Sequence, residues 1–90
     1  MNGIEYAIVA LKKQMEAYFT SPTLGKIYGT VTTEDHITYF FKGRAVLICI
    51  ELCRKQSGGW FCPKDQWLHD HQVNEIGMQI DHIENWLSAQ

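Results

Sequence analysis

The chain has 90 residues, of which 46% are hydrophobic, 12% aromatic and 20% charged, and its formal net charge is −2. This length predicts one small domain spanning residues 1–90, and the composition excludes intrinsic disorder. No run of about 18 apolar residues occurs and the N-terminus lacks a signal-peptide pattern, so we expect no membrane segment and a cytoplasmic protein with reduced thiols.

An amphipathic helix is predicted over residues 3–19. The apolar side chains of this segment recur at spacings of three and four residues, which is the period of one helix face, and they are Ile4, Ile8, Leu11, Met15 and Tyr18. Pro22 and Gly25 follow and predict a turn that ends the helix.

An antiparallel hairpin is predicted next. Residues 26–33 and 36–43 are rich in β-branched and aromatic side chains, and the Glu34-Asp35 pair between them can form a short turn. A short additional strand is predicted from Trp60 to Cys62, after the glycine pair at positions 58 and 59.

Residues 44–53 support two predictions. As a strand, this segment is apolar on both faces, which is typical of a central strand covered on both sides. As a helix over residues 45–55, it would end in basic residues and a glycine pair, which is typical of a helix C-terminus. Because β-branched residues are frequent here, we favour the strand.

A C-terminal helix is predicted within residues 65–90. Its start is open, because Pro63 suits a first helical turn while the polar stretch near residue 70 predicts a kink or a restart. Apolar residues then recur at spacings of three and four, and we expect this seam to pack in the core or to pair with a second copy: Val73, Ile76, Ile80, Ile83 and Leu87.

The predicted fold class is therefore α+β. The expected order is an N-terminal helix, a three- to four-stranded antiparallel sheet and a C-terminal helix, with the helices on one side of the sheet. A central strand that is apolar on both faces requires a second cover, and a chain of this size buries only about 60–65% of its unfolded surface. Both observations favour a homodimer.

The charges are distributed unevenly along the chain. Residues 1–64 carry eight bases against five acids, a balance of +3, whereas residues 65–90 carry five acids and no base, a balance of −5. An acidic helix face attracts a basic protein surface. The expected partner-binding residues are Asp70, Glu75, Asp81, Glu84 and Trp86.

Nucleic-acid binding is an alternative that depends on the basic and aromatic middle of the chain. A sheet with exposed rings and basic flanks can bind single strands, and the residues that would form such a platform are Lys42, Arg44, Arg54, Lys55 and Trp60. The acidic tail and the negative net charge oppose this interpretation, so nucleic acid is not the expected partner.

Zinc binding is a second alternative. The candidate ligands are Cys49, Cys53, Cys62 and His69, but their spacing lacks the tight pairs that zinc sites use. Cys62 is also the best-placed thiol for a cysteine–histidine nucleophile, since it precedes the predicted helix, yet no catalytic signature surrounds it. We therefore expect no cofactor and no catalytic residue.

These patterns together favour a small non-enzymatic interaction module, such as an inhibitor or accessory factor, that binds a protein with a basic surface. Single-stranded nucleic-acid binding and zinc binding are the two alternatives.

Overall fold

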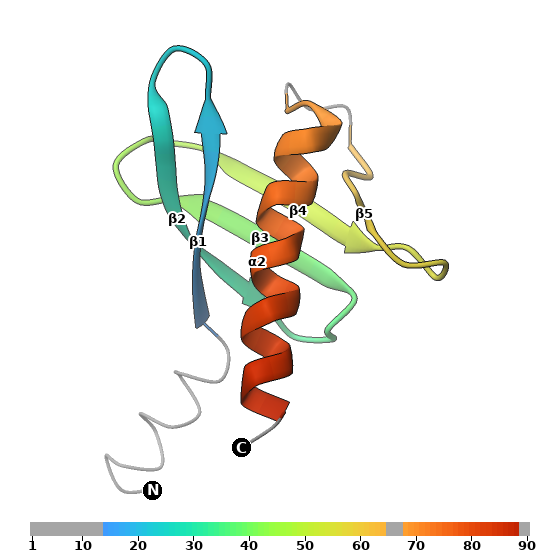
Figure 1. Ribbon diagram of the computed structural model, residues 1–90. Helices are drawn as coiled ribbons and strands as arrows, with labels where there is room; N and C mark the ends of the chain where they lie inside the picture. The colour runs from blue at the N-terminus through green and yellow to red at the C-terminus, as the bar shows by residue number, and fades with distance from the viewer. Residues whose placement is uncertain (1–13, 65–67, 89–90) are drawn as a thin grey trace, which may run out of the picture.

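The computed structural model describes residues 14–64 and 68–88. They form a curved antiparallel sheet with one helix, α2, lying across its inner face (Figure 1). The strands follow one another in the sheet in chain order, as a meander. The elements are β1 (Gln14–Ser21), β2 (Gly25–Thr33), β3 (Thr38–Gly43), β4 (Cys49–Arg54), β5 (Trp60–Phe61) and α2 (Asp70–Ser88).

The sheet has one buried face because its strands alternate apolar side chains toward α2 with other side chains toward solvent. The buried side chains of the strands are Met15, Ala17, Phe19, Ile27, Val31, Tyr39, Phe41, Ile50, Leu52 and Trp60. The helix contributes Val73, Ile76 and Ile80 to the same core. Three residues of the predicted seam therefore belong to the core, and Ile83 packs beside them. Leu87, the last residue of the seam, is 39% exposed.

The helix lies between the two ends of the sheet, against both β1 and β5. Gly77 makes the approach to β5 possible, because a Cβ atom at this position would lie 2.2 Å from Cδ1 of Trp60. The helix begins where the sequence is most polar. The Gln72 side chain accepts a hydrogen bond from the His69 backbone N–H at 2.9 Å, so it caps the first turn.

The turn between β2 and β3 is fixed by its own side chains. The Asp35 carboxylate accepts hydrogen bonds from the backbone N–H groups of Ile37 and Thr38, at 2.9 and 2.8 Å. His36 adopts a φ of 60°, in the left-handed region that tight turns require. The predicted hairpin over residues 26–43 is confirmed, with this turn between its strands.

The predicted N-terminal helix is wrong for residues 14–19, which belong to β1. Residues 3–13 lie outside the described residues. The error has a physical origin, since Met15 and Phe19 fit a helical spacing of four and also a strand alternation with Ala17 between them. All three are buried against α2, so the alternation is the pattern that the fold uses.

The strand prediction for the middle segment is confirmed for Cys49–Arg54, and the alternative helix there is wrong. The described residues cover only one face of this strand, and the second cover by a partner subunit stays a prediction. Ile50 and Leu52 face the core, whereas Cys49 is exposed on the other face. Leu47 precedes the strand, and its side chain is fully exposed. The α+β class, with an antiparallel sheet and a C-terminal helix, is confirmed.

Candidate functional site

Arg54, at the end of β4, is the centre of a polar cluster beneath α2. Its guanidinium donates to Asp81 and to Glu84, each at 2.5 Å. The Tyr39 hydroxyl donates to Glu84 at 2.6 Å, and the Trp60 indole N–H donates to Asp81 at 3.2 Å. The guanidinium also lies 4.5 Å from the centroid of the Trp60 ring. The cluster therefore joins β3, β4 and β5 to the C-terminal half of α2.

The charges of this cluster stabilise one another. Burial by itself raises the pKa of Glu84, but hydrogen bonds from Tyr39, His36 and Arg54 outweigh that effect and hold its pKa below the ordinary value. Burial, together with the hydrogen bond to Glu84, raises the pKa of Tyr39 to about 12. At neutral pH, Glu84 is thus a carboxylate that accepts from a neutral phenol and a cation.

A second group of α2 side chains closes the free edge of β1. The Gln79 side chain donates to the Tyr18 carbonyl at 2.7 Å and accepts from the Tyr18 N–H at 3.0 Å. Glu75 accepts from the Thr20 N–H at 2.8 Å, and Gln72 donates to the Thr20 carbonyl at 2.9 Å. Backbone groups that would otherwise offer a pairing site are thereby occupied.

Three of the five predicted partner-binding residues are therefore engaged within the chain. Asp81 and Glu84 bind Arg54, and Glu75 binds the edge of β1. Asp70 and Trp86 are exposed, and Trp86 is 60% exposed near the end of α2. The predicted acidic surface thus has its acids turned largely toward the sheet. The charge count could not predict these pairings, because it does not show which side of the helix faces the sheet.

The predicted nucleic-acid residues are divided between different parts of the molecule. Arg54 and Trp60 belong to the interior cluster. Lys42 lies on the outer face of β3, and Arg44 follows β3 and pairs with Glu16 at 2.8 Å. The five residues therefore do not form one platform.

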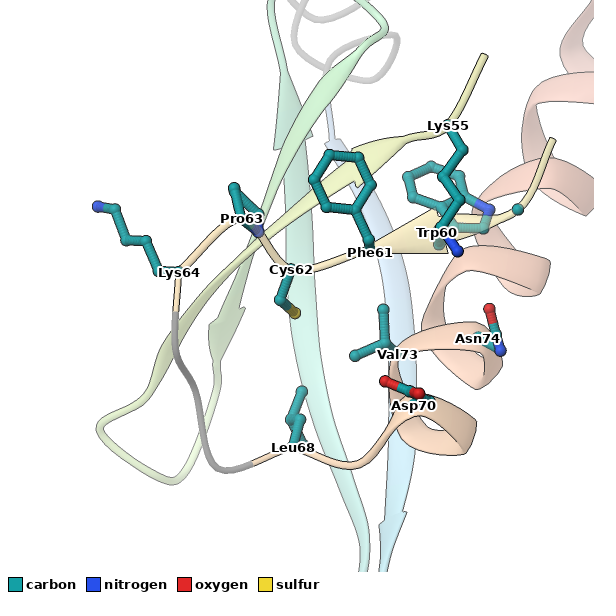
Figure 2. A pocket seen from close by; sticks show the side chains of 11 residues that line it. Lys55, Trp60, Phe61, Cys62, Pro63, Lys64, Leu68, Asp70, Val73 and Asn74 are labelled. Atoms are coloured by element: carbon teal, nitrogen blue, oxygen red, sulfur yellow. The ribbon is translucent and has the colours of Figure 1, made fainter. Parts of the chain in front are cut away.

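A pocket of about 550 Å³ lies between β5, the segment that follows it and the start of α2 (Figure 2). Its walls include Pro63, Leu68 and Val73, and the carboxylate of Asp70 lies at its rim with Asn74. The Cys62 thiol points into this space. Burial and the neighbouring thiol of Cys53 raise the pKa of Cys62, so the group is a neutral thiol at neutral pH and a weak nucleophile.

The alternative zinc ligands are also separated. Cys49 is exposed on β4, whereas Cys53 and Cys62 are half-buried, and the ring of His69 stacks on that of His71 at 5.7 Å. Within residues 14–64 and 68–88, no three His, Cys, Asp or Glu side chains are grouped so as to hold a metal ion. In the same part of the chain, no helix is both long enough and apolar enough to cross a membrane.

The outer face of the sheet is left uncovered by the described residues, because α2 occupies the inner face (Figure 1). Three aromatic side chains from three strands are exposed there: Tyr28 at 51%, Phe40 at 42% and Phe61 at 41%. Tyr18 and Tyr28 are direct neighbours across β1 and β2, with ring centroids 5.6 Å apart. Lys26 lies over the Tyr18 ring at 4.6 Å.

Comparison of the chain with protein-family models, with curated proteins and with solved structures finds no match.

Proposed function

We propose that the chain is a small protein-binding module that holds its partner on the outer face of the sheet. The observation that carries this proposal is the exposure of Tyr28, Phe40 and Phe61 on three strands of one face. Aromatic side chains are enriched at the centres of protein interfaces, where they bury a large area at a small cost in conformational entropy. An inhibitor or accessory factor acts through such a surface without a catalytic group.

The acidic helix supports this proposal less than the sheet does. Asp81 and Glu84 are paired with Arg54, and removing them from that pairing would leave its guanidinium without its two carboxylates. A basic partner would compete for carboxylates that already have a charge partner. A basic partner surface would therefore bind acidic residues outside the Arg54 cluster, such as Asp70, which is exposed in α2.

The test is affinity capture with two matched variants. Phe40→Lys places a charge in the centre of the outer face, whereas Met78→Lys places one on α2 at a residue that is 69% exposed and lies away from that face. Both variants should fold, since neither side chain belongs to the core.

We expect Phe40→Lys to weaken binding of the captured partner by about tenfold or more, as for an aromatic residue at an interface, and Met78→Lys to leave it unchanged. Equal capture by wild type and Phe40→Lys would reject the outer face as the binding surface.

Single-stranded nucleic acid is the second candidate partner for the same face. It is supported by Lys26 over the Tyr18 ring and by the exposed Lys42, because bases stack on rings while cations bind phosphates. A retardation of single-stranded RNA or DNA that weakens with salt and is lost in Lys42→Glu would favour it. No retardation at low salt would remove it.

A further inference from the structure

Both glutamates on the outer face of the sheet already have a cationic partner. Glu16 and Glu51 belong to this face, because they alternate with buried residues of β1 and β4. The Glu16 carboxylate accepts a hydrogen bond from the Arg44 guanidinium at 2.8 Å. The Glu51 carboxylate lies 3.5 Å from Nζ of Lys64. Each pair is neutral as a unit, so the two glutamates give the outer face no net negative charge.

Two lysines of the same face have no such partner. Lys26 and Lys42 lie on the outer face by the burial alternation of β2 and β3, and both are exposed. Among the described residues, no carboxylate lies within ion-pair distance of either ammonium group. Lys26 instead lies over the Tyr18 ring, 4.6 Å from its centroid. The outer face therefore carries two positive charges that the chain itself does not compensate.

The helix has the opposite sign of charge. It carries four acids and no lysine or arginine: Asp70, Glu75, Asp81 and Glu84. Two of these carboxylates share one guanidinium, that of Arg54, so α2 stays net negative. A negatively charged partner is therefore attracted to the outer face and repelled by the helix, which gives it one preferred side of the molecule.

The strand register sets the free lysines and the exposed rings in alternation. Lys26 and Tyr28 are successive outward residues of β2, separated by about 6.6 Å along the strand. Lys42 pairs with Thr30, the next outward residue of β2, so it lies one step beyond Tyr28. Phe40 is the next outward residue of β3 and lies one step further. Cations and rings therefore alternate from β2 to β3.

Phe61 continues this series toward β5. The outward residue after Phe40 on β3 is Thr38, which pairs with Cys53 of β4. Cys53 pairs in turn with Phe61. The series therefore crosses the sheet diagonally from β2 to β5, in the order cation, ring, cation, ring, ring.

We propose that the outer face binds an acidic segment of a partner protein, in which carboxylate and apolar side chains alternate on one side of an extended chain. The inference rests on the proposed function and adds the charge and the pattern of the partner. An extended segment presents every second side chain to one side, at the same step of about 6.6 Å. Its carboxylates pair with Lys26 and Lys42, and its apolar side chains contact the rings of Tyr28 and Phe40.

A nucleic-acid strand matches this face less closely than such a segment does. Its phosphates form a continuous row of negative charge, which would meet Glu16 and Glu51 as well as the two lysines. With two free lysines, few counterions are released on binding, so the electrostatic gain is small. A polypeptide can place its acids opposite the lysines alone.

The test is fluorescence anisotropy of a labelled peptide of the repeat Glu-Ser-Leu-Ser, which sets glutamate and leucine alternately on one side. A peptide of the repeat Lys-Ser-Leu-Ser and a single-stranded oligothymidylate are the comparison probes. The variant Lys26→Gln/Lys42→Gln removes the two free charges of the outer face. Its matched control, Met78→Glu/Asn85→Asp, makes the same change in net charge at exposed positions of α2.

We expect the acidic peptide to bind more tightly than the basic peptide, and we expect added salt to weaken its binding. Its affinity should fall about fivefold or more in Lys26→Gln/Lys42→Gln and stay nearly unchanged in the α2 control. Phe40→Ala, which removes a ring without adding a charge, should also weaken it. Circular dichroism checks that each variant is folded.

Failure of the acidic peptide to bind, or tighter binding of the basic peptide, overturns the proposal. So does an equal loss in the two double variants, which would mean that only the overall charge matters. Tighter binding of the oligothymidylate would assign the face to nucleic acid. A captured partner that is weakened by Phe40→Ala and unchanged in Lys26→Gln/Lys42→Gln would keep the outer face as the binding surface and refute the acidic segment.

Discussion

Gly77 in α2 offers a sharp test of how the helix lies on the sheet, because replacing it by alanine should reverse the effect expected for a helix. In a solvent-exposed helix interior, Gly→Ala is stabilising by about 1 kcal/mol, since alanine has less conformational freedom to lose. Here an added Cβ would lie 2.2 Å from Cδ1, 2.3 Å from Cγ and 2.5 Å from Nε1 of Trp60. Contact with the ring opposes the gain in helix propensity.

The size of the effect follows from these distances. An ordinary contact begins near 3.4 Å, so the helix and the ring must separate by about 1.2 Å, which is 3.4 minus 2.2. The ring cannot turn aside freely, because its N–H donates to Asp81 and its face lies against Arg54. Overpacking of this kind costs about 1–3 kcal/mol, and losing the indole hydrogen bond costs about 1 kcal/mol more. After the propensity gain, we expect a net loss of about 1–3 kcal/mol.

The assay is urea unfolding followed by circular dichroism, with thermal unfolding in parallel. For a domain of this size, the expected loss lowers Tm by roughly 5–20 °C. Asn85→Ala, at an exposed position of the same helix, is the matched control and should raise stability by a few tenths of a kcal/mol. The double variant Gly77→Ala/Trp60→Leu should lose less than the sum of its parts, since the smaller side chain leaves room for the methyl group.

A result in which Gly77→Ala raises the free energy of unfolding by about 1 kcal/mol would refute this reasoning. It would mean that the helix is not held against Trp60.

Two further predictions concern the Arg54 cluster. Arg54→Met should lower the free energy of unfolding by about 1–3 kcal/mol. This loss is smaller than for a fully buried ion pair, because the Asp81 side chain is 41% exposed and the Glu84 side chain 19% exposed. A loss below about 0.5 kcal/mol in urea unfolding would contradict this prediction. Tyr39 has a folded pKa of about 12 against an ordinary value of 10.0, so its contribution to stability is complete below pH 10 and is lost as the pH rises through about 12. Unfolding curves measured across this range should show the loss in wild type and not in Tyr39→Phe, and equal slopes in the two proteins would exclude it.

Several elements of the fold could be predicted from local pattern alone. Residues 26–43 are β-rich around a polar turn, and the Asp35 side chain bonds the turn by itself. The stripe of Val73, Ile76 and Ile80 predicts a helix in any context, because only a helix brings these side chains to one face. In both cases the signal depends on neighbours in sequence.

The candidate site was less accessible to the same reasoning. Gln72, Glu75 and Gln79 lie on one flank of the helix, at spacings of three and four residues beside the apolar seam, and this polar stripe is the signal that could have been noted. What it bonds to could not be foreseen, because its partners are backbone groups of β1, far away in the chain.

The sequence by itself determined that the chain forms an antiparallel hairpin, a further apolar strand and a C-terminal amphipathic helix, since these depend on short-range periodicity and turn chemistry. Only the tertiary structure decided that residues 14–21 form a strand, because Met15 and Phe19 fit both periods and burial against α2 selects one. It also decided the role of the acids. Net charge is a sum over the chain, whereas the partner of each carboxylate depends on where the helix lies on the sheet, and that is set by the packing of Gly77 on Trp60.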